Sequence, residues 1–190
     1  MNVTSRGHRL GAEATPESAA SLRPSMAVGE VLDTAALIAW PLERMRGSLV
    51  VHSQRAELSR ISPDREIILD AAGLEWASPG SSAITRASDL ATATGDMAGL
   101  SPVDLELLAL AIERAATLAT DDYRLQNLCE LGGVPWLSVT TEGISSLWSW
   151  ELRCTGCGVV LPPPNTPSSR RELGTCSDCG STLKLSRKRD

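Results

Sequence analysis

The sequence is poor in aromatic residues and has no Phe. It holds one Tyr and five Trp among 190 residues, so the hydrophobic core must consist mainly of Leu, Ile, Val and Ala. Such aliphatic composition favours a layered α/β fold. No run of about 18 uncharged apolar residues occurs, which excludes a transmembrane helix. Residues 1–25 lack the apolar segment of a secretory signal. We therefore expect a cytoplasmic protein with a disordered extension over 1–25, and Met26 as a second candidate start.

The charge is distributed unevenly along the chain. The formal net charge of -5 divides into +1 for residues 1–25, -9 for residues 26–150 and +3 for residues 151–190 with neutral cysteines. An acidic body joined to a basic end suggests that different parts of the chain bind metal and substrate. The basic end is either an ordinary solvated tail or a phosphate-binding segment. Apart from Arg153, its basic residues lie in the loop between the cysteine pairs and in the tail: Arg170, Arg171, Lys184, Arg187, Lys188 and Arg189.

Four of the five cysteines form two C-x2-C pairs separated by 18 residues, namely Cys154, Cys157, Cys176 and Cys179. This spacing is typical of a tetrahedral Zn2+ site. Gly158 and Gly180 follow the pairs and permit the tight turns of zinc knuckles. Two disulfides and an iron–sulfur cluster are the alternatives; the lack of an export signal and the paired knuckles favour zinc. We predict a structural zinc ribbon whose metal supplies folding free energy. Cys129 stands alone and is interpreted as a small core residue.

Apolar strand-like segments alternate with helical patterns through the body of the chain. We predict strands ending at Leu32 and His52 and over 117–120 and 134–140, with another extended segment over 65–76. Helices are predicted between these strands, one of them beginning with Ser101 as its N-cap and Asp104 three residues later. The alternation predicts a mostly parallel sheet with crossover helices. Ligands bind such sheets beyond the carboxyl ends of the strands.

Four acidic residues are expected to meet at that edge: Asp33, Glu57, Asp104 and Asp122. Each has an ordinary explanation when taken alone, since Asp104 and Asp122 can cap helices, Asp33 can end a strand and Glu57 can lie exposed on a helix. Together they cannot all stay ionised without a cation, and hard divalent ions prefer oxygen ligands. Mg2+ or Mn2+ in such a site can activate water to attack a phosphodiester. The combination indicates nuclease chemistry.

Several segments resemble the PIN-domain ribonucleases: VLDTAALI, TGDMAGLSPVDLELLALA and ATLATDDYRLQN. With the C-terminal ribbon they resemble, more narrowly, the archaeal Nob endonuclease family over about residues 27–185. The resemblance implies a three-layer α/β PIN-like nuclease domain with a mostly parallel sheet over 26–143. It also implies a linker, zinc ribbon and basic tail over 144–190.

The resemblance also implies roles for individual residues. The metal-binding acids of the family fall on Asp33, Glu57, Asp104 and Asp122. Asp122 is preferred to Asp121 because the family pattern is Thr-x-Asp and Thr120 supplies the Thr, so Asp121 would add negative potential. Thr34 and Asn127 match positions beside the site. The sequence departs from the family pattern at Ala35, where a small polar residue is common, and in HSQRAEL, which lacks a Thr-Pro before the glutamate helix.

The resemblance implies a Mg2+- or Mn2+-dependent endoribonuclease that processes precursor small-subunit ribosomal RNA within a pre-ribosomal particle. Its zinc ribbon and basic tail would hold the RNA. The alternatives are a toxin-type PIN ribonuclease that cuts tRNA or mRNA, and a non-catalytic assembly factor. Trp148 and Trp150 either stack on bases or pack the hinge between body and ribbon, and we favour packing. The cleavage position, the number of metal ions and the oligomeric state are left open.

Overall fold

The computed structural model describes residues 29–166 and 173–188. The predictions made for residues 1–25 and Met26, and those for Arg170, Arg171 and Arg189, concern positions outside these ranges. Within the described ranges, no helix is long and apolar enough to cross a lipid bilayer.

The body is built on a five-stranded sheet in the order β3-β2-β1-β4-β5, in which every neighbouring pair is parallel. Leu32 in β1 lies opposite Ala119 in β4, so these two strands end side by side. Between β1 and β4 the strand order reverses direction, which is where parallel α/β sheets open a crevice for ligands. The strands are β1 (Glu30–Leu32), β2 (Leu49–Val51), β3 (Glu75–Ala77), β4 (Thr117–Ala119) and β5 (Trp136–Leu137).

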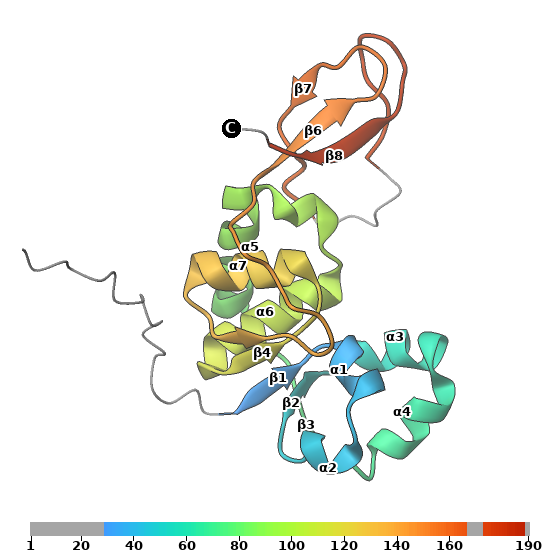
Figure 1. Ribbon diagram of the computed structural model, residues 1–190, viewed down its shortest axis with the longest axis vertical. Coiled ribbons are helices and arrows are strands. Elements are labelled where there is room, and N and C mark those ends of the chain that lie inside the picture. The colour runs from blue at the N-terminus through green and yellow to red at the C-terminus, as the bar shows by residue number, and fades with distance from the viewer. Residues whose placement is uncertain (1–28, 167–172, 189–190) are drawn as a thin grey trace, which may run out of the picture.

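Helices cover both faces of this sheet and make a three-layer α/β fold (Figure 1). On one face lie α1 (Thr34–Ala39), α2 (Leu42–Met45), α3 (Gln54–Ile61) and α4 (Pro63–Leu69). On the other face lie α5 (Ser81–Thr94), the 3-10 turn η1 (Asp96–Gly99), α6 (Pro102–Arg114) and α7 (Tyr123–Gly132). Successive strand residues point to opposite faces, so Val31 packs with the second group and Leu32 with the first. Leu, Val and Ala dominate both cores, with Met97, Cys129 and Met45 among them and Trp side chains only at their margins.

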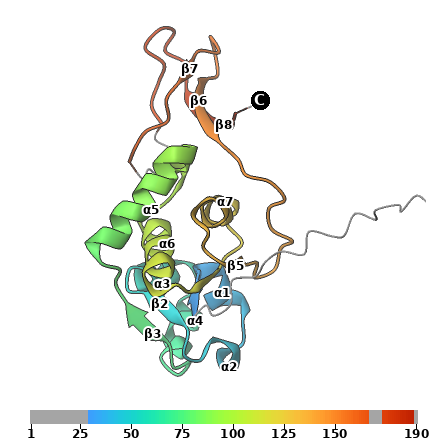
Figure 2. The same cartoon turned by 90° about the vertical axis from the view of Figure 1, so that its left-hand side faces the viewer.

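The C-terminal part forms a separate antiparallel sheet in the order β7-β6-β8. Its strands are β6 (Trp150–Cys154), β7 (Val160–Leu161) and β8 (Leu183–Arg187). This sheet stands beyond the end of α5, and the chain that leads to it runs past α7 (Figure 2). Gly95, with φ of 77°, lies at this junction, where a Cβ would come within 2.7 Å of the Trp150 carbonyl oxygen. Only glycine fits both the backbone conformation and the space.

The predicted fold class and most predicted elements are confirmed, and one element is wrong. The segment 65–76 was expected to be extended, but its first half belongs to α4, and only Glu75–Ala77 form a strand. Pro63 at the first helical position, with Asp64 and Glu66 in the first turn, favours the helix. The apolar triplet Ile67, Ile68 and Leu69 is too short to distinguish a helix from a strand by its periodicity.

Candidate active site and metal centres

Asp33 lies where the strands β1 and β4 end, at the point where the strand order of the sheet reverses. It is the N-cap of α1, and its carboxylate accepts hydrogen bonds from the Thr34 backbone N–H at 2.5 Å and from Thr120 Oγ1 at 2.6 Å. The Asp33 backbone N–H donates to the Ala119 carbonyl at 3.0 Å, which fixes the position of the side chain relative to β4. The prediction that Asp33 directly follows a buried strand, at the carboxyl edge of the sheet, is confirmed.

Thr120 and Thr34 connect Asp33 to two of the other predicted acids. Thr120 Oγ1 also accepts the Asp122 backbone N–H at 3.0 Å, so one hydroxyl joins the end of β4 to the start of α7. Thr34 Oγ1 donates to Glu57 Oε2 at 2.9 Å, which joins the start of α1 to α3. Glu57, whose helix lacks the family's usual preceding residues, is therefore brought to the same edge as Asp33.

Asp104 and Asp122 occupy the first turns of two helices. Ser101 and Asp104 form a complete capping box at the start of α6: the Ser101 hydroxyl accepts the Asp104 N–H, and Asp104 Oδ2 accepts the Ser101 N–H at 2.8 Å. Asp122 is the N-cap of α7 and accepts the Arg124 N–H at 2.7 Å. Both acids thus have the structural role foreseen for them.

The electrostatics tie the four acids into one group. Burial raises the pKa of Asp33 to about 6, and the negative charges of Asp104 and Asp122 contribute to the rise. Burial also raises the pKa of Asp104, with further contributions from the charges of Asp122 and Glu57. Carboxylates that raise one another's pKa gain most from a bound cation. An all-oxygen donor set of this kind suits Mg2+ or Mn2+.

The acids are less tightly grouped than the cysteines. In residues 29–166 and 173–188, the one cluster of three or more potential ligands whose atoms all lie within 4.8 Å of one another consists of the four cysteine sulfurs. No three of the four predicted acids, all of which lie in these ranges, meet that spacing in the structure.

Two residues that hold this edge together were not singled out in the sequence. Gln54, fully buried, accepts the Val51 N–H and donates to the Leu32 carbonyl at 2.9 Å, and so joins the ends of β2 and β1. Gln126 donates to the Thr120 carbonyl at 2.9 Å and orients the end of β4. A glutamine at a helical position is common on any protein surface, so only its burial identifies the role.

Asp121 has a different role from the one expected of it. Its carboxylate accepts backbone N–H groups from Val139, Thr140 and Thr141 and both threonine hydroxyls, so it fixes the loop after β5. Burial acts to raise the pKa of Asp121, but the hydrogen bonds from Thr140, Thr141 and Val139 outweigh it and lower the pKa to about 2. The paired aspartates are therefore explained separately: Asp121 binds a loop and Asp122 caps a helix.

A second, fully buried acid links the body to the C-terminal sheet. Asp96 in η1 is 0% exposed and accepts hydrogen bonds from Arg124 Nη1 at 3.1 Å and Asn127 Nδ2 at 2.9 Å. Asn127 also bonds both the N–H and the carbonyl of Trp148, at 2.6 and 2.8 Å. Burial raises the pKa of Asp96 against the opposing hydrogen bonds of Thr94 and Asn127 and the charge of Arg124. Nothing in TGDMAGL indicates that this aspartate is buried.

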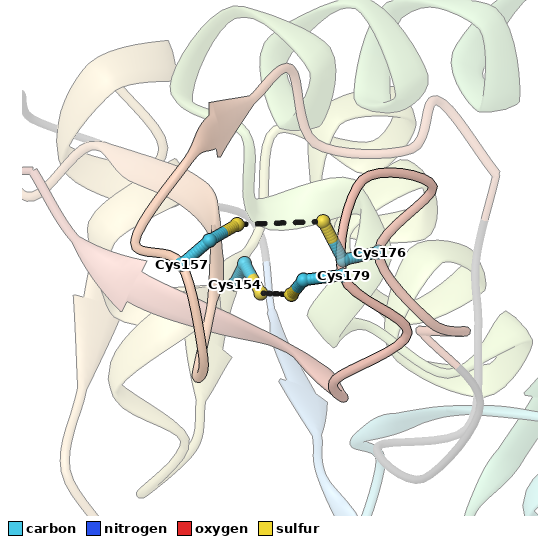
Figure 3. A group of neighbouring side chains, drawn as sticks. All are labelled: Cys154, Cys157, Cys176 and Cys179. Carbon is cyan, nitrogen blue, oxygen red and sulfur yellow. Dashed lines mark hydrogen bonds between the residues drawn. The ribbon is translucent and has the colours of Figure 1, made fainter.

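The four cysteines come together beside the end of β6 at Cys154 and the start of β8 at Leu183 (Figure 3). The sulfurs of Cys154 and Cys179 lie 3.4 Å apart and those of Cys157 and Cys176 lie 3.7 Å apart. Sulfurs at the corners of a tetrahedron around Zn2+ are about 3.8 Å apart, given Zn–S bonds of about 2.3 Å. The Gly156 N–H donates to the Cys154 sulfur, and Gly158 and Gly180 have φ of 78° and 74°, as knuckle turns require. The cluster fits zinc and is too widely spaced for disulfides.

The fifth cysteine is confirmed as a core residue. Cys129 is 0% exposed within α7 and packs in the core between the sheet and α5 to α7. Burial raises the pKa of its thiol far above the ordinary value, which makes it a poor nucleophile.

Comparisons with known proteins agree with this fold and site. Residues 31–113 match the PIN domain of ribonuclease. The chain is 31% identical over 167 residues to "Endoribonuclease Nob1" of Methanothermobacter thermautotrophicus, covering 85% of this chain and 94% of that protein. It is 33% identical to "Endoribonuclease Nob1" of Pyrococcus abyssi, over 63% and 70% of the two chains. It is also 30% identical to "Ribonuclease VapC1" of Thermoplasma acidophilum, over 81% and 76%.

The chain belongs to the PIN-domain ribonuclease family. Its activity is therefore that of an endoribonuclease, and PIN nucleases generally use divalent metal ions to hydrolyse phosphodiester bonds. The parallel sheet and the flanking helices account for the fold, and the cysteine cluster accounts for the ribbon.

Proposed function

We propose that this endoribonuclease processes precursor small-subunit ribosomal RNA, with Asp33, Glu57, Asp104 and Asp122 as its catalytic acids. In this proposal Asp33, Asp104 and Asp122 bind Mg2+ or Mn2+, which activates a water and stabilises charge on the attacked phosphodiester. Glu57, held by Thr34, shapes the same edge. Thr120 keeps Asp33 and Asp122 in fixed relation by bonding both. The partner is the pre-ribosomal particle, and the compartment is the cytoplasm.

The single observation that carries this choice of substrate is that the acidic body and a zinc-ribbon-type sheet are one connected unit. Trp148 lies immediately before the ribbon, and both its backbone N–H and its carbonyl form hydrogen bonds with the Asn127 side chain. Asn127 lies in α7, four residues after Tyr123. The chain also covers 94% of the Nob1 relative from Methanothermobacter, which supports a shared arrangement of both parts. The toxin-type alternative is supported by the 30% identity to VapC1. A toxin-type role does not explain why a ribbon should be fixed beside the acids.

The basic end is proposed to hold the RNA. Lys184 and Lys188 are exposed on and after β8, and the body carries a net charge of -9 over residues 26–150. Replacing Lys184 and Lys188 together with Ala in the full chain should weaken binding of precursor RNA. It should also reduce the slope of log affinity against log salt by about 1.4 for single-stranded contacts. An unchanged slope would contradict the proposed role of these two lysines.

One cleavage assay separates the candidate functions. The wild-type chain, an Asp33→Asn variant and an Asp89→Asn control, which changes an exposed acid on α5, are each incubated with Mn2+ and two substrates. The substrates are a precursor small-subunit RNA fragment and bulk tRNA. We expect one specific cut in the precursor from wild type and control, and none from Asp33→Asn. Scattered cutting of tRNA would support the toxin-type function, and no cutting of either RNA would support a non-catalytic assembly factor.

A further inference from the structure

A cavity of about 300 Å³ lies beside the proposed metal site. Its walls come from the start of α7 and from the segment that enters the ribbon, and they consist of Asp121, Asp122, Tyr123, Arg124, Trp148 and Trp150. These include three of the six aromatic residues of the chain. Half of the aromatic residues of the chain therefore line this one cavity, next to the proposed catalytic carboxylate of Asp122.

The aromatic rings form a contiguous wall. The Tyr123 and Trp148 centroids are 5.9 Å apart with the rings tilted by 55°, and those of Trp148 and Trp150 are 6.0 Å apart, edge to face. Guanidinium groups already cover the two indoles, with Arg187 4.9 Å from Trp148 and Arg124 3.8 Å from Trp150. Tyr123, in contrast, is 43% exposed. Its ring is therefore the surface on which a flat ligand can stack.

The wall is also held in place before any ligand binds. Asn127 fixes the Trp148 backbone through two hydrogen bonds, and Asp96 holds both Asn127 and Arg124. Gly99 leaves room for Arg124, because a Cβ there would lie 2.4 Å from the Arg124 Cζ. A binding surface that is ordered in advance loses little conformational freedom when it binds. The expectation that the two tryptophans pack the hinge is thus correct, and the same packing builds the cavity.

We propose that this cavity binds one unpaired nucleobase of the RNA substrate, stacked on Tyr123 and flanked by Trp148, close to the bond that is cut. Aromatic stacking is the usual way in which proteins hold single-stranded bases, and it tolerates any base. Arg124 is paired with the buried Asp96, but the exposed Arg187 supplies positive charge beside the Trp148 ring, which suits a base that is followed by phosphates. Because Asp122 belongs both to the cavity and to the acid group, the stacked base would be a near neighbour of the scissile phosphate. This inference rests on the proposed function, in which Asp122 binds the metal.

The test combines changes in the protein with the removal of single bases from the RNA. The probe is a single-stranded fragment spanning the expected precursor cleavage region, made as a series in which one nucleotide at a time is abasic. Binding of each RNA is measured by fluorescence anisotropy without added Mg2+ or Mn2+, so that the fragment remains uncut. The proteins are full-length wild type, Tyr123→Ala, Tyr123→Phe and a Leu147→Ala control. Leu147 is 54% exposed on the same segment and does not line the cavity.

We expect one abasic position to weaken binding to wild type by about tenfold, within the range for loss of one stacked base. Tyr123→Ala should bind the intact RNA about tenfold more weakly and should be insensitive to that same abasic position. Tyr123→Phe and Leu147→Ala should behave as wild type. Equal sensitivity of wild type and Tyr123→Ala to every abasic position would overturn the proposal, as would unchanged affinity in Tyr123→Ala. If the RNA binds in the predicted pattern but is never cut with Mn2+, the proposed function fails while the base-binding cavity stands.

Discussion

Replacing Asp33 with Asn should make the metal-free protein more stable at neutral pH. The folded protein raises the pKa of Asp33 from 3.8 to about 6, because burial and the neighbouring acids disfavour its ionised form. An acid with a raised pKa binds its proton more tightly when folded. Its favourable contribution is complete below pH 3.8 and is lost as the pH rises through about 6. At pH 7.5 the ionised carboxylate therefore destabilises the fold, and the Asn side chain removes that charge.

The size of the effect follows from the structure. The rise in pKa to about 6 corresponds to about 3 kcal/mol of unfolding free energy, which partial contact of Asp33 with water reduces. Asparagine can still accept the Thr34 N–H, but it cannot accept the Thr120 hydroxyl with the amide nitrogen in that place. That loss costs about 1 kcal/mol. We therefore expect a net gain of about 1–2 kcal/mol, or about 2–8 °C in Tm for a chain of this size.

The assay is thermal unfolding with saturating Zn2+, at pH 7.5 and pH 4, with and without Mg2+, using Asp89→Asn as the control. The gain from Asp33→Asn should be present at pH 7.5 and absent at pH 4. Mg2+ should raise the Tm of wild type more than that of the variant, because a ligand stabilises the state that binds it. A variant less stable than wild type at pH 7.5 without Mg2+ would refute this reasoning, as would a gain of equal size at pH 4.

Three further predictions concern the residues that position the site. Cys157→Ser should lower the bound Zn2+ measured by metal analysis, because it removes one of the four thiolate ligands. It should also remove amide protection from β6 and β8 while the body stays folded. Full zinc content in the variant would contradict the four-thiolate assignment. Asp121→Ala should cost about 2 kcal/mol of unfolding free energy, because it removes the acceptor for three backbone N–H groups. Hydrogen exchange at residues 139–141 should become faster. Unchanged exchange there would show that the Asp121 hydrogen bonds do not hold the loop. Gly99→Ala should displace Arg124 and cost about 1–3 kcal/mol of unfolding free energy, measured by urea unfolding. The control is Gly133→Asn, because Gly133 has open space around it and asparagine tolerates its positive φ. Equal small losses in the two variants would argue against a clash at Gly99.

The sequence predicts the positions of Asp33 and Asp104 in the fold well because both lie beside a strong local signal. Asp33 follows an apolar strand, and Ser101, Pro102 and Asp104 form a helix-start pattern that the structure reproduces as a full capping box. Hydrogen bonds and shared charge then connect the acids, as parallel strand topology implies. The cysteine cluster could also be predicted from the sequence, because two C-x2-C pairs at this spacing are typical of a tetrahedral metal site.

The residues that the sequence does not reveal act through long-range contacts. Asp96 is 28 residues from Arg124 and 31 from Asn127, and no local pattern distinguishes it from a surface acid. Asp121 was grouped with Asp122 because they are adjacent, but its partners lie 18 to 20 residues away in the loop after β5. The cavity beside Asp122 likewise depends on Trp148 returning to the start of α7. Such contact partners are determined by tertiary packing. Composition and periodicity do not predict which distant residue a given side chain will contact.

The central claim is that Asp33, Asp104 and Asp122 share a divalent cation. Crystals of the zinc-loaded protein soaked in Mn2+ and measured at the manganese absorption edge test it most directly. We expect an anomalous peak within bonding distance of carboxylate oxygens from all three residues, and its loss in Asp33→Asn. A peak that avoids these carboxylates, or one that persists unchanged in the variant, would contradict the account.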